Sequence, residues 1–183
     1  MPDLLGEGFS LAFVRSLPVD DLLVRYGCAP DSLQRMTLAD AREEALDDEE
    51  GVMICAGRSG DWSFALQHWG VRILEEGVVQ KVSAGTTAVV LISTASAPAF
   101  MYVRDGSEIC GFDPGLPHLR YGTDPDRFSA EMARAGLPTD GSPAGPGVVS
   151  AMLRFAGDTF GLSLSQSSVL RDELLIGTVP EHD

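Results

Sequence analysis

The chain has 183 residues, of which 27 are aspartate or glutamate and 13 are lysine or arginine, so its formal net charge at pH 7 is −14. A surface of this sign repels nucleic acid and attracts basic proteins, which argues against a function in binding phosphate backbones. A hydrophobic content of 44% can fill a core without a metal or a disulfide framework, and we expect one domain over residues 1–183.

The first segments predicted along the chain are a strand and two short helices. Residues 10–16 alternate loosely between apolar and polar positions and predict the strand. Pro18 suits the first turn of a helix and Gly27 suits the left-handed position that ends one, so we expect a helix between them. Thr37 is the next expected N-cap, because it stands three residues before Asp40 in an imperfect capping box.

The helix expected after Thr37, with the turn that follows it, carries the densest negative charge in the chain. Only Arg42 compensates its carboxylates locally. The acidic residues are Asp40, Glu43, Glu44, Asp47, Asp48, Glu49 and Glu50. The macrodipole opposes those near the C-terminal end of the helix, which lowers stability. The stretch is interpreted first as a solvated face that keeps the protein soluble, and second as a surface that binds a basic protein.

Two β-hairpins are predicted in the middle of the chain. Residues 52–56 and 62–66 flank a short loop that contains glycine, which is a strong hairpin signal. Residues 99–104 and 107–112 flank the pair Asp105-Gly106, which prefers the positive φ angles of a type I′ turn. Both patterns predict antiparallel pairing between neighbouring strands.

A helix and a central strand are expected between the two hairpins. The apolar spacing over residues 71–82 predicts the helix, and the run at 86–94 is typical of a strand buried on both faces. Trp62 and Trp69 flank His68 closely enough to suggest a ligand pocket, but we expect the tryptophans to pack in the core.

The last third of the chain is predicted to be loops and helices. Prolines and glycines predict a long loop after residue 112. Helices are expected at 126–135 and 148–160, with a flexible Pro/Gly connector near 137–147. A last helix capped by Ser165 would carry Val169, Leu170, Leu174 and Leu175. The predicted fold is α+β, a five- or six-stranded, largely antiparallel sheet with about five or six helices packed mainly on one face.

The histidines and cysteines show no spacing typical of a catalytic or metal site. The histidines are scattered, at His68, His118 and His182. The cysteines are also far apart and are expected to be buried free thiols, at Cys28, Cys55 and Cys110. Cys110 and His118 are the one such pair close in sequence, and their interpretation as nucleophile and base ranks below inert burial. We therefore expect no catalytic residue, no cofactor and no metal.

A cluster of polar residues in the 113–126 loop is the best candidate for a small-molecule or metal-assisted site. Its members are Asp113, Arg120, Tyr121, Asp124 and Asp126. Aspartate before proline or at a helix start is ordinary turn and cap chemistry, so a structural role is the first interpretation. A hydrolase would require these carboxylates to converge within metal-ligand distance in a cleft.

The sequence contains no pattern typical of export or of a membrane span. The N-terminus has no basic region followed by an apolar core, and no window approaches the roughly 20 apolar residues that cross a bilayer. We expect a cytoplasmic protein.

Five short motifs carry a family resemblance. They are GRSGDWSFAL at 57–66, SAGT at 83–86, DG at 105–106, FDP at 112–114 and RYGTDPD at 120–126. Together they resemble an uncharacterised family of small bacterial domains of unknown function. The resemblance spans most of the chain, and it implies an intracellular single-domain protein without an established activity, cofactor or catalytic residue.

The acidic surplus favours protein binding over catalysis. We expect a non-enzymatic protein that uses the acidic stretch to recognise a basic protein, for instance as an immunity protein or inhibitor of a toxin or nuclease. Nucleic acid and membranes are not expected partners. One alternative is a regulatory or scaffold subunit of a bacterial assembly that docks through a sheet edge or a helix face. A weaker one is a metal-assisted hydrolase that uses the 113–126 loop.

Overall fold

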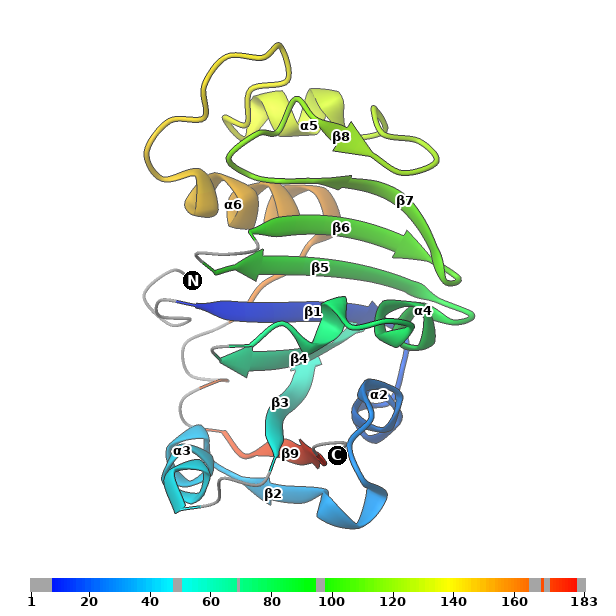
Figure 1. The fold of residues 1–183 in the computed structure, drawn as a ribbon, viewed down its shortest axis with the longest axis vertical. Coiled ribbons are helices and arrows are strands. Elements are labelled where there is room, and N and C mark those ends of the chain that lie inside the picture. The colour runs from blue at the N-terminus through cyan, green and yellow to red at the C-terminus, as the bar shows by residue number, and fades with distance from the viewer. Residues whose placement is uncertain are drawn as a thin grey trace.

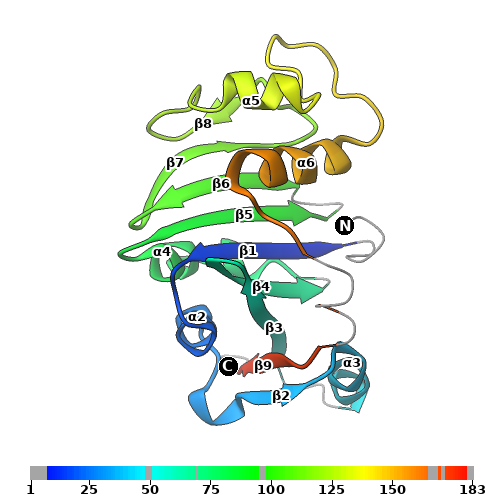
Figure 2. The ribbon, with the colours of Figure 1, turned by 180° about the vertical axis from the view of Figure 1, so that it is seen from behind.

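The described residues build one antiparallel sheet of nine strands with helices on both of its faces (Figures 1 and 2). The computed structural model describes residues 8–47, 51–68, 70–94, 98–164, 169 and 172–180, without the side chains of Arg42 and residues 44–47. The strands are β1 (Phe9–Arg15), β2 (Gln34–Met36), β3 (Val52–Ser59), β4 (Trp62–His68), β5 (Thr87–Ser93), β6 (Ala99–Arg104), β7 (Ser107–Phe112), β8 (Arg120–Tyr121) and β9 (Leu174–Val179). Their order in the sheet is β2-β9-β3-β4-β1-β5-β6-β7-β8.

The central strand β1 lies between β4 and β5 and is buried on both faces. Its side chains alternate between two cores, with Phe9, Leu11 and Phe13 in one and Ala12 and Val14 in the other. A strand covered on both faces tolerates apolar residues at every position. This explains why the alternation along the predicted first strand is loose.

The helices divide between the two faces, and each face has its own core. They are α2 (Val19–Tyr26), α3 (Leu38–Asp47), α4 (Val78–Ser83), α5 (Ser129–Arg134) and α6 (Val148–Phe160), with 3-10 turns η1 (Pro30–Ser32) and η2 (Arg72–Leu74). Residues of α3, α5 and α6 join the core that contains Phe13, whereas residues of α2 and α4 join the core that contains Val14 (Figures 1 and 2). No helix in the described part of the chain is both long and apolar enough to cross a membrane.

The prediction of five or six strands with helices mainly on one face is wrong, although the α+β class holds. The largest local error is at Leu174 and Leu175, which helical spacing predicts on a last helix. They lie instead in β9, which pairs with β3 on one side and β2 on the other. Pairing with segments distant in sequence therefore outweighs the local spacing. Val169 is helical and buried, and Ser165 and Leu170 lie outside the described residues.

The predicted caps of the first two helices are confirmed. Pro18 precedes α2, and Gly27 ends it with a left-handed φ of 101°. At the start of α3, the backbone N–H of Asp40 donates to Thr37 Oγ1 at 3.2 Å, and the Thr37 hydroxyl donates to Asp40 Oδ2 at 2.7 Å. Thr37 is therefore the expected N-cap, but Asp40 accepts from the Thr37 hydroxyl and not from its backbone N–H, so these contacts form only the first half of a capping box.

Both predicted hairpins and the predicted helix at 148–160 are also confirmed. β3 pairs with β4, and β6 pairs with β7. Asp105 and Gly106 have φ angles of 47° and 74°, as a type I′ turn requires. β5 is the expected central strand, because it pairs with β1 and β6 and its middle residues are buried.

Two predicted helices are shorter than their apolar patterns indicate. The helix expected over residues 71–82 is divided into η2 and α4, because Gly77 adopts a left-handed φ of 77° between them. The helix expected over residues 126–135 begins only at Ser129. In both cases the apolar spacing is correct and the break comes from local backbone geometry.

Candidate functional site

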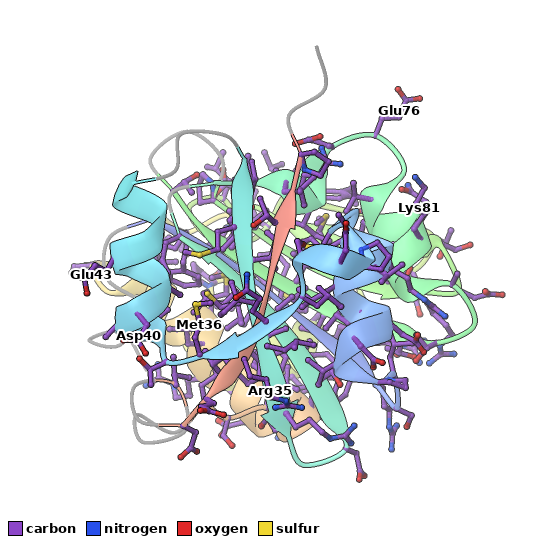
Figure 3. The ribbon with its side chains drawn as sticks, turned by 90° about the horizontal axis from the view of Figure 1, so that it is seen from below. Arg35, Met36, Asp40, Glu43, Glu76 and Lys81 are labelled. Carbon is purple, nitrogen blue, oxygen red and sulfur yellow. The ribbon has the colours of Figure 1, made fainter. Side chains whose placement is uncertain are left out.

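The described part of the acidic stretch lies on the outer side of α3. Leu38 and Ala41 face the core, with exposures of 1% and 0%, whereas Asp40 and Glu43 are exposed (Figure 3). The helical period therefore separates an apolar side from an acidic one. The side chains of Glu44 and Asp47, together with Asp48, Glu49 and Glu50, lie outside the described residues.

Other carboxylates lie at the same end of the molecule as α3. This end consists of α2, η1, β2 and α3 (Figure 1). Asp20 and Asp21 in the first turn of α2, and Asp31 in η1, are exposed. Acidic side chains in a first turn complement the positive end of the helix, so the α2 pair is also favourable for folding. This acidic end, defined by Asp20, Asp21, Asp31, Asp40 and Glu43, extends beyond the stretch predicted from the sequence.

Most arginines in the described part of the chain are used in internal contacts. Those that bind a carboxylate or a backbone carbonyl of this chain are Arg25, Arg58, Arg72, Arg120, Arg127, Arg134 and Arg154. None of these contacts uses a carboxylate of the acidic end. No ion pair among the described residues therefore involves a carboxylate of the acidic end, although Arg25 of α2 and the exposed Arg35 of β2 lie at the same end.

The polar loop at 113–126 is arranged around Arg120. Its guanidinium binds Asp126 Oδ1 through Nη2 at 2.6 Å and Nε at 3.0 Å, and it donates to the carbonyl of Pro117 at 3.0 Å. The Arg120 side chain is 13% exposed, whereas Asp126 is 73% exposed. Arg120 thus connects two ends of the loop, at Pro117 and at Asp126.

The other members of this loop have separate structural partners. Asp124 binds Arg127 at 3.2 Å, and Asp113 Oδ1 accepts the backbone N–H of Gly115 at 2.7 Å in a turn. Tyr121 lies against Gly111, where a Cβ atom would meet its ring at 2.5 Å. Among the described residues, no three histidine, cysteine or acidic side chains are grouped to hold a metal. The loop geometry therefore gives no support to the metal-assisted hydrolase.

Cys110 lies beneath the same loop and is fully buried. Its thiol donates to the carbonyl of Pro125 at 3.3 Å, so the structure does not pair it with His118. Burial raises the pKa of Cys110 to about 11, with Arg120 opposing the shift and neighbouring carboxylates adding to it. The group is a neutral thiol at physiological pH, which makes it a poor nucleophile.

We expect Ellman's reagent to label none of the three cysteines of the native protein at pH 8, and all of them after unfolding in guanidinium. Because the folded pKa of Cys110 lies above its ordinary value of 9.0, its neutral form favours folding below about pH 9. That contribution disappears as pH rises through about 11. Rapid labelling of native Cys110 at pH 8, with C110A as the control, would contradict this account.

A cavity of about 480 Å³ lies where the C-terminal end of α6 meets the sheet. On the face that carries Phe13, the apolar alternation of three strands ends in polar residues: Arg15 in β1, Thr87 in β5 and Arg104 in β6. Register places them in one row, because Val14 pairs with Ala88 and Thr87 pairs with Arg104. The cavity therefore lies at the edge of the core that contains Phe13, where these strands end or begin.

The walls of this cavity come from five separate segments of the chain. Trp62 pairs with Arg15 across β4 and β1, and Phe160 and Gly161 supply the end of α6. The Ser59 hydroxyl donates to the carbonyl of Ser163 at 2.5 Å and joins the β3–β4 hairpin to the segment after α6.

No sequence motif marks this cavity. Arg15 and Arg104 come into one row, on either side of Thr87, only through the pairing of β1, β5 and β6. The sequence contains one indication of the cavity. Each arginine is the last residue of its strand, at a position where the alternating pattern predicts a core-facing apolar residue. Predicting the site from that indication requires the strand order, which local patterns do not provide.

The fold and these surfaces define an α+β protein with an acidic end and a ligand-sized cavity. The chain belongs to DUF6461, a family of unknown function, whose sequence model matches residues 2–183. This confirms the resemblance to a family of unknown function. Comparison with curated proteins and with solved structures finds no match.

Proposed function

We propose that this protein is a non-catalytic binding protein whose acidic end recognises a basic protein partner. The observation that carries the proposal is the exposure of Asp40 and Glu43 on α3, while most described arginines are held by other parts of the chain. With a net charge of −14, this surface attracts a basic protein and repels nucleic acid.

The class of partner that suits such a surface is an enzyme with a basic groove, such as a toxin or nuclease. A carboxylate surface can occupy a groove that binds phosphates, because both present negative charge to the same cations. Long-range attraction also raises the association rate, which matters for an inhibitor that must act before its target does. As part of this proposal, the protein acts in the cytoplasm as an immunity protein or inhibitor.

The D40N/E43Q variant tests the proposal when it is used as bait in affinity capture from the cells that produce the protein. Wild type should retain a basic protein at low salt, and the variant should retain at least several-fold less, because two charges of the epitope are gone. The matched control is E76Q/D158N, which removes the same charge from exposed residues outside α3; Figure 3 shows Glu76 on the other side of the molecule from Asp40.

The dependence of binding on salt distinguishes this proposal from its main alternative, a scaffold subunit. A partner held by the acidic end should be released at about 0.5 M salt, where the Debye length is only a few ångströms. Equal retention by all three baits, even at this ionic strength, would contradict recognition by α3. It would favour a scaffold subunit that docks through an apolar face or a sheet edge, although the edge strand β2 is only three residues long.

A further inference from the structure

The cavity at the end of α6 contains two cations that the fold leaves unpaired. Arg15 and Arg104 are exposed, and neither has a carboxylate partner among the described residues. The lining contains these two arginines and one aspartate, Asp61, whereas the whole chain has 13 basic and 27 acidic residues. This cavity is therefore a locally positive site in a strongly negative protein.

Aromatic side chains hold both guanidinium groups in place. The guanidinium carbon of Arg15 lies 6.0 Å from the ring centre of Trp62, and that of Arg104 lies 5.9 Å from the ring centre of Tyr102. Arg104 Nη2 also donates to the Tyr102 hydroxyl at 2.9 Å. A guanidinium positioned by an aromatic ring keeps further N–H groups at its edge for a second acceptor. Arginine that is fixed in this way binds an anion with less loss of side-chain entropy.

A small aromatic surface lies beside the two cations. The rings of Tyr102 and Phe160 are stacked, with their centres 5.4 Å apart and an angle of 14° between the planes. Trp62 is 8% exposed and lines the same space. The accessible lining of the cavity is mainly polar, with a small aromatic part, and a volume of about 480 Å³ is within the usual range of small-molecule sites.

The geometry points to a binding site for a small molecule that has one anionic group, either a carboxylate or a phosphate, and at most a small planar ring. The anion lies between Arg15 and Arg104, and a ring that it carries lies at the small aromatic part of the wall, beside Tyr102, Phe160 and Trp62. Thr87 adds a hydroxyl between the two arginines in the row. Asp61 on the cavity wall disfavours ligands with a second negative group. This site is independent of the acidic end, and the two proposals can fail separately.

A purely structural role for the arginines makes different predictions. The C-terminal end of α6 carries partial negative charge, and nearby cations stabilise such an end. In that case the removal of either arginine lowers stability, and the cavity binds no anion. Binding measurements therefore decide between the two roles.

The test is a titration of the ¹⁵N-labelled protein with benzoate, phenyl phosphate and the neutral analogue benzamide. We expect benzoate to shift the backbone signals of Arg15, Thr87 and Arg104 and the indole signal of Trp62, with a Kd on the order of 1 mM for so small a ligand. Benzamide should shift them little. The ratio of the benzoate and phenyl phosphate affinities shows whether carboxylate or phosphate is the better anion.

Substitutions connect the binding to the two arginines. R15Q and R104Q should each weaken benzoate binding roughly tenfold, since each removes one charge-assisted hydrogen bond. R15K and R104K keep the charge and should bind between wild type and the glutamine variants. The control is R35Q, which removes an exposed arginine from β2 at the far edge of the sheet (Figure 3) and should leave the affinity unchanged.

The dispersion of each variant's spectrum verifies its fold, so a loss of binding is not mistaken for unfolding. Three results would overturn the inference: no shift of these signals by either anion, equal binding of benzamide, or unchanged benzoate affinity in folded R15Q and R104Q.

Discussion

F155A should lower the free energy of unfolding by about 3–5 kcal/mol, as expected for a large aromatic side chain removed from a packed core. Phe155 lies on α6 and is 0% exposed. Its ring centre lies 5.0 Å from that of Phe100 and 6.0 Å from those of Phe112, Phe128 and Phe160. This single side chain therefore joins α6 to β6, to β7 and to the segment before α5.

Urea denaturation followed by circular dichroism measures this loss. L119A is the control, because Leu119 is 59% exposed and its truncation should change stability by less than about 0.5 kcal/mol. A loss below about 1 kcal/mol in F155A would show that α6 does not pack on the sheet as described. F155L should fall between these values, since it keeps most of the apolar volume.

I176D should abolish cooperative unfolding at room temperature, because it places a carboxylate in a buried apolar cluster. Ile176 lies in β9, is 4% exposed and belongs to the core that contains Phe13. An unpaired charge at such a position lowers stability by more than about 4 kcal/mol, a large part of the total of roughly 5–15 kcal/mol for a domain. The near-ultraviolet circular dichroism of the variant should be lost together with its sharp thermal transition.

The conservative variant I176V is the control. It shows whether the loss in I176D comes from the buried charge or from any change in the C-terminal segment. It should remain folded and lose only about 0.5–1.5 kcal/mol. A native-like thermal transition in I176D would contradict the position of β9 between β2 and β3. It would instead favour the last helix that the local sequence pattern predicts.

The parts of the fold that follow from sequence are those decided by neighbouring residues. The capping box at Thr37 and Asp40 and the turn at Asp105 and Gly106 depend on side chains and φ angles within a few positions. The same is true of the two hairpins, whose strands pair with their immediate neighbours in sequence. Each of these features is correctly predicted because no distant contact competes with it.

The errors occur where distant pairing decides the structure. β2 has three residues and β8 has two, too few for a recognisable alternation. β9 has an apolar pattern that is compatible with a helix, and only the open edges of β2 and β3 select the strand. Helices on both faces follow from the burial of β1 on both sides, which is visible only after its neighbours are known.

The candidate sites also differ in how far the sequence alone predicts them. The acidic surface is predictable, since charge is read directly from the sequence, and the exposure of Asp40 and Glu43 agrees with it. The members of the 113–126 loop are predictable as a group, but their ion pairs with Arg120 and Arg127 are not. The cavity between Arg15 and Arg104 depends on the order of the strands and is found only in the structure.

The association rate of the purified partner, measured by stopped flow between about 0.05 M and about 0.5 M salt, tests recognition by the acidic end most directly. We expect the wild-type rate to fall at least about tenfold over this range. In D40N/E43Q the rate at low salt should be lower and its dependence on salt weaker, and the variant that also changes Asp47, Asp48, Glu49 and Glu50 to Asn or Gln should show a larger effect. E76Q/D158N should behave nearly as wild type does. Identical rates and identical salt slopes for wild type and the α3 variants would contradict the account.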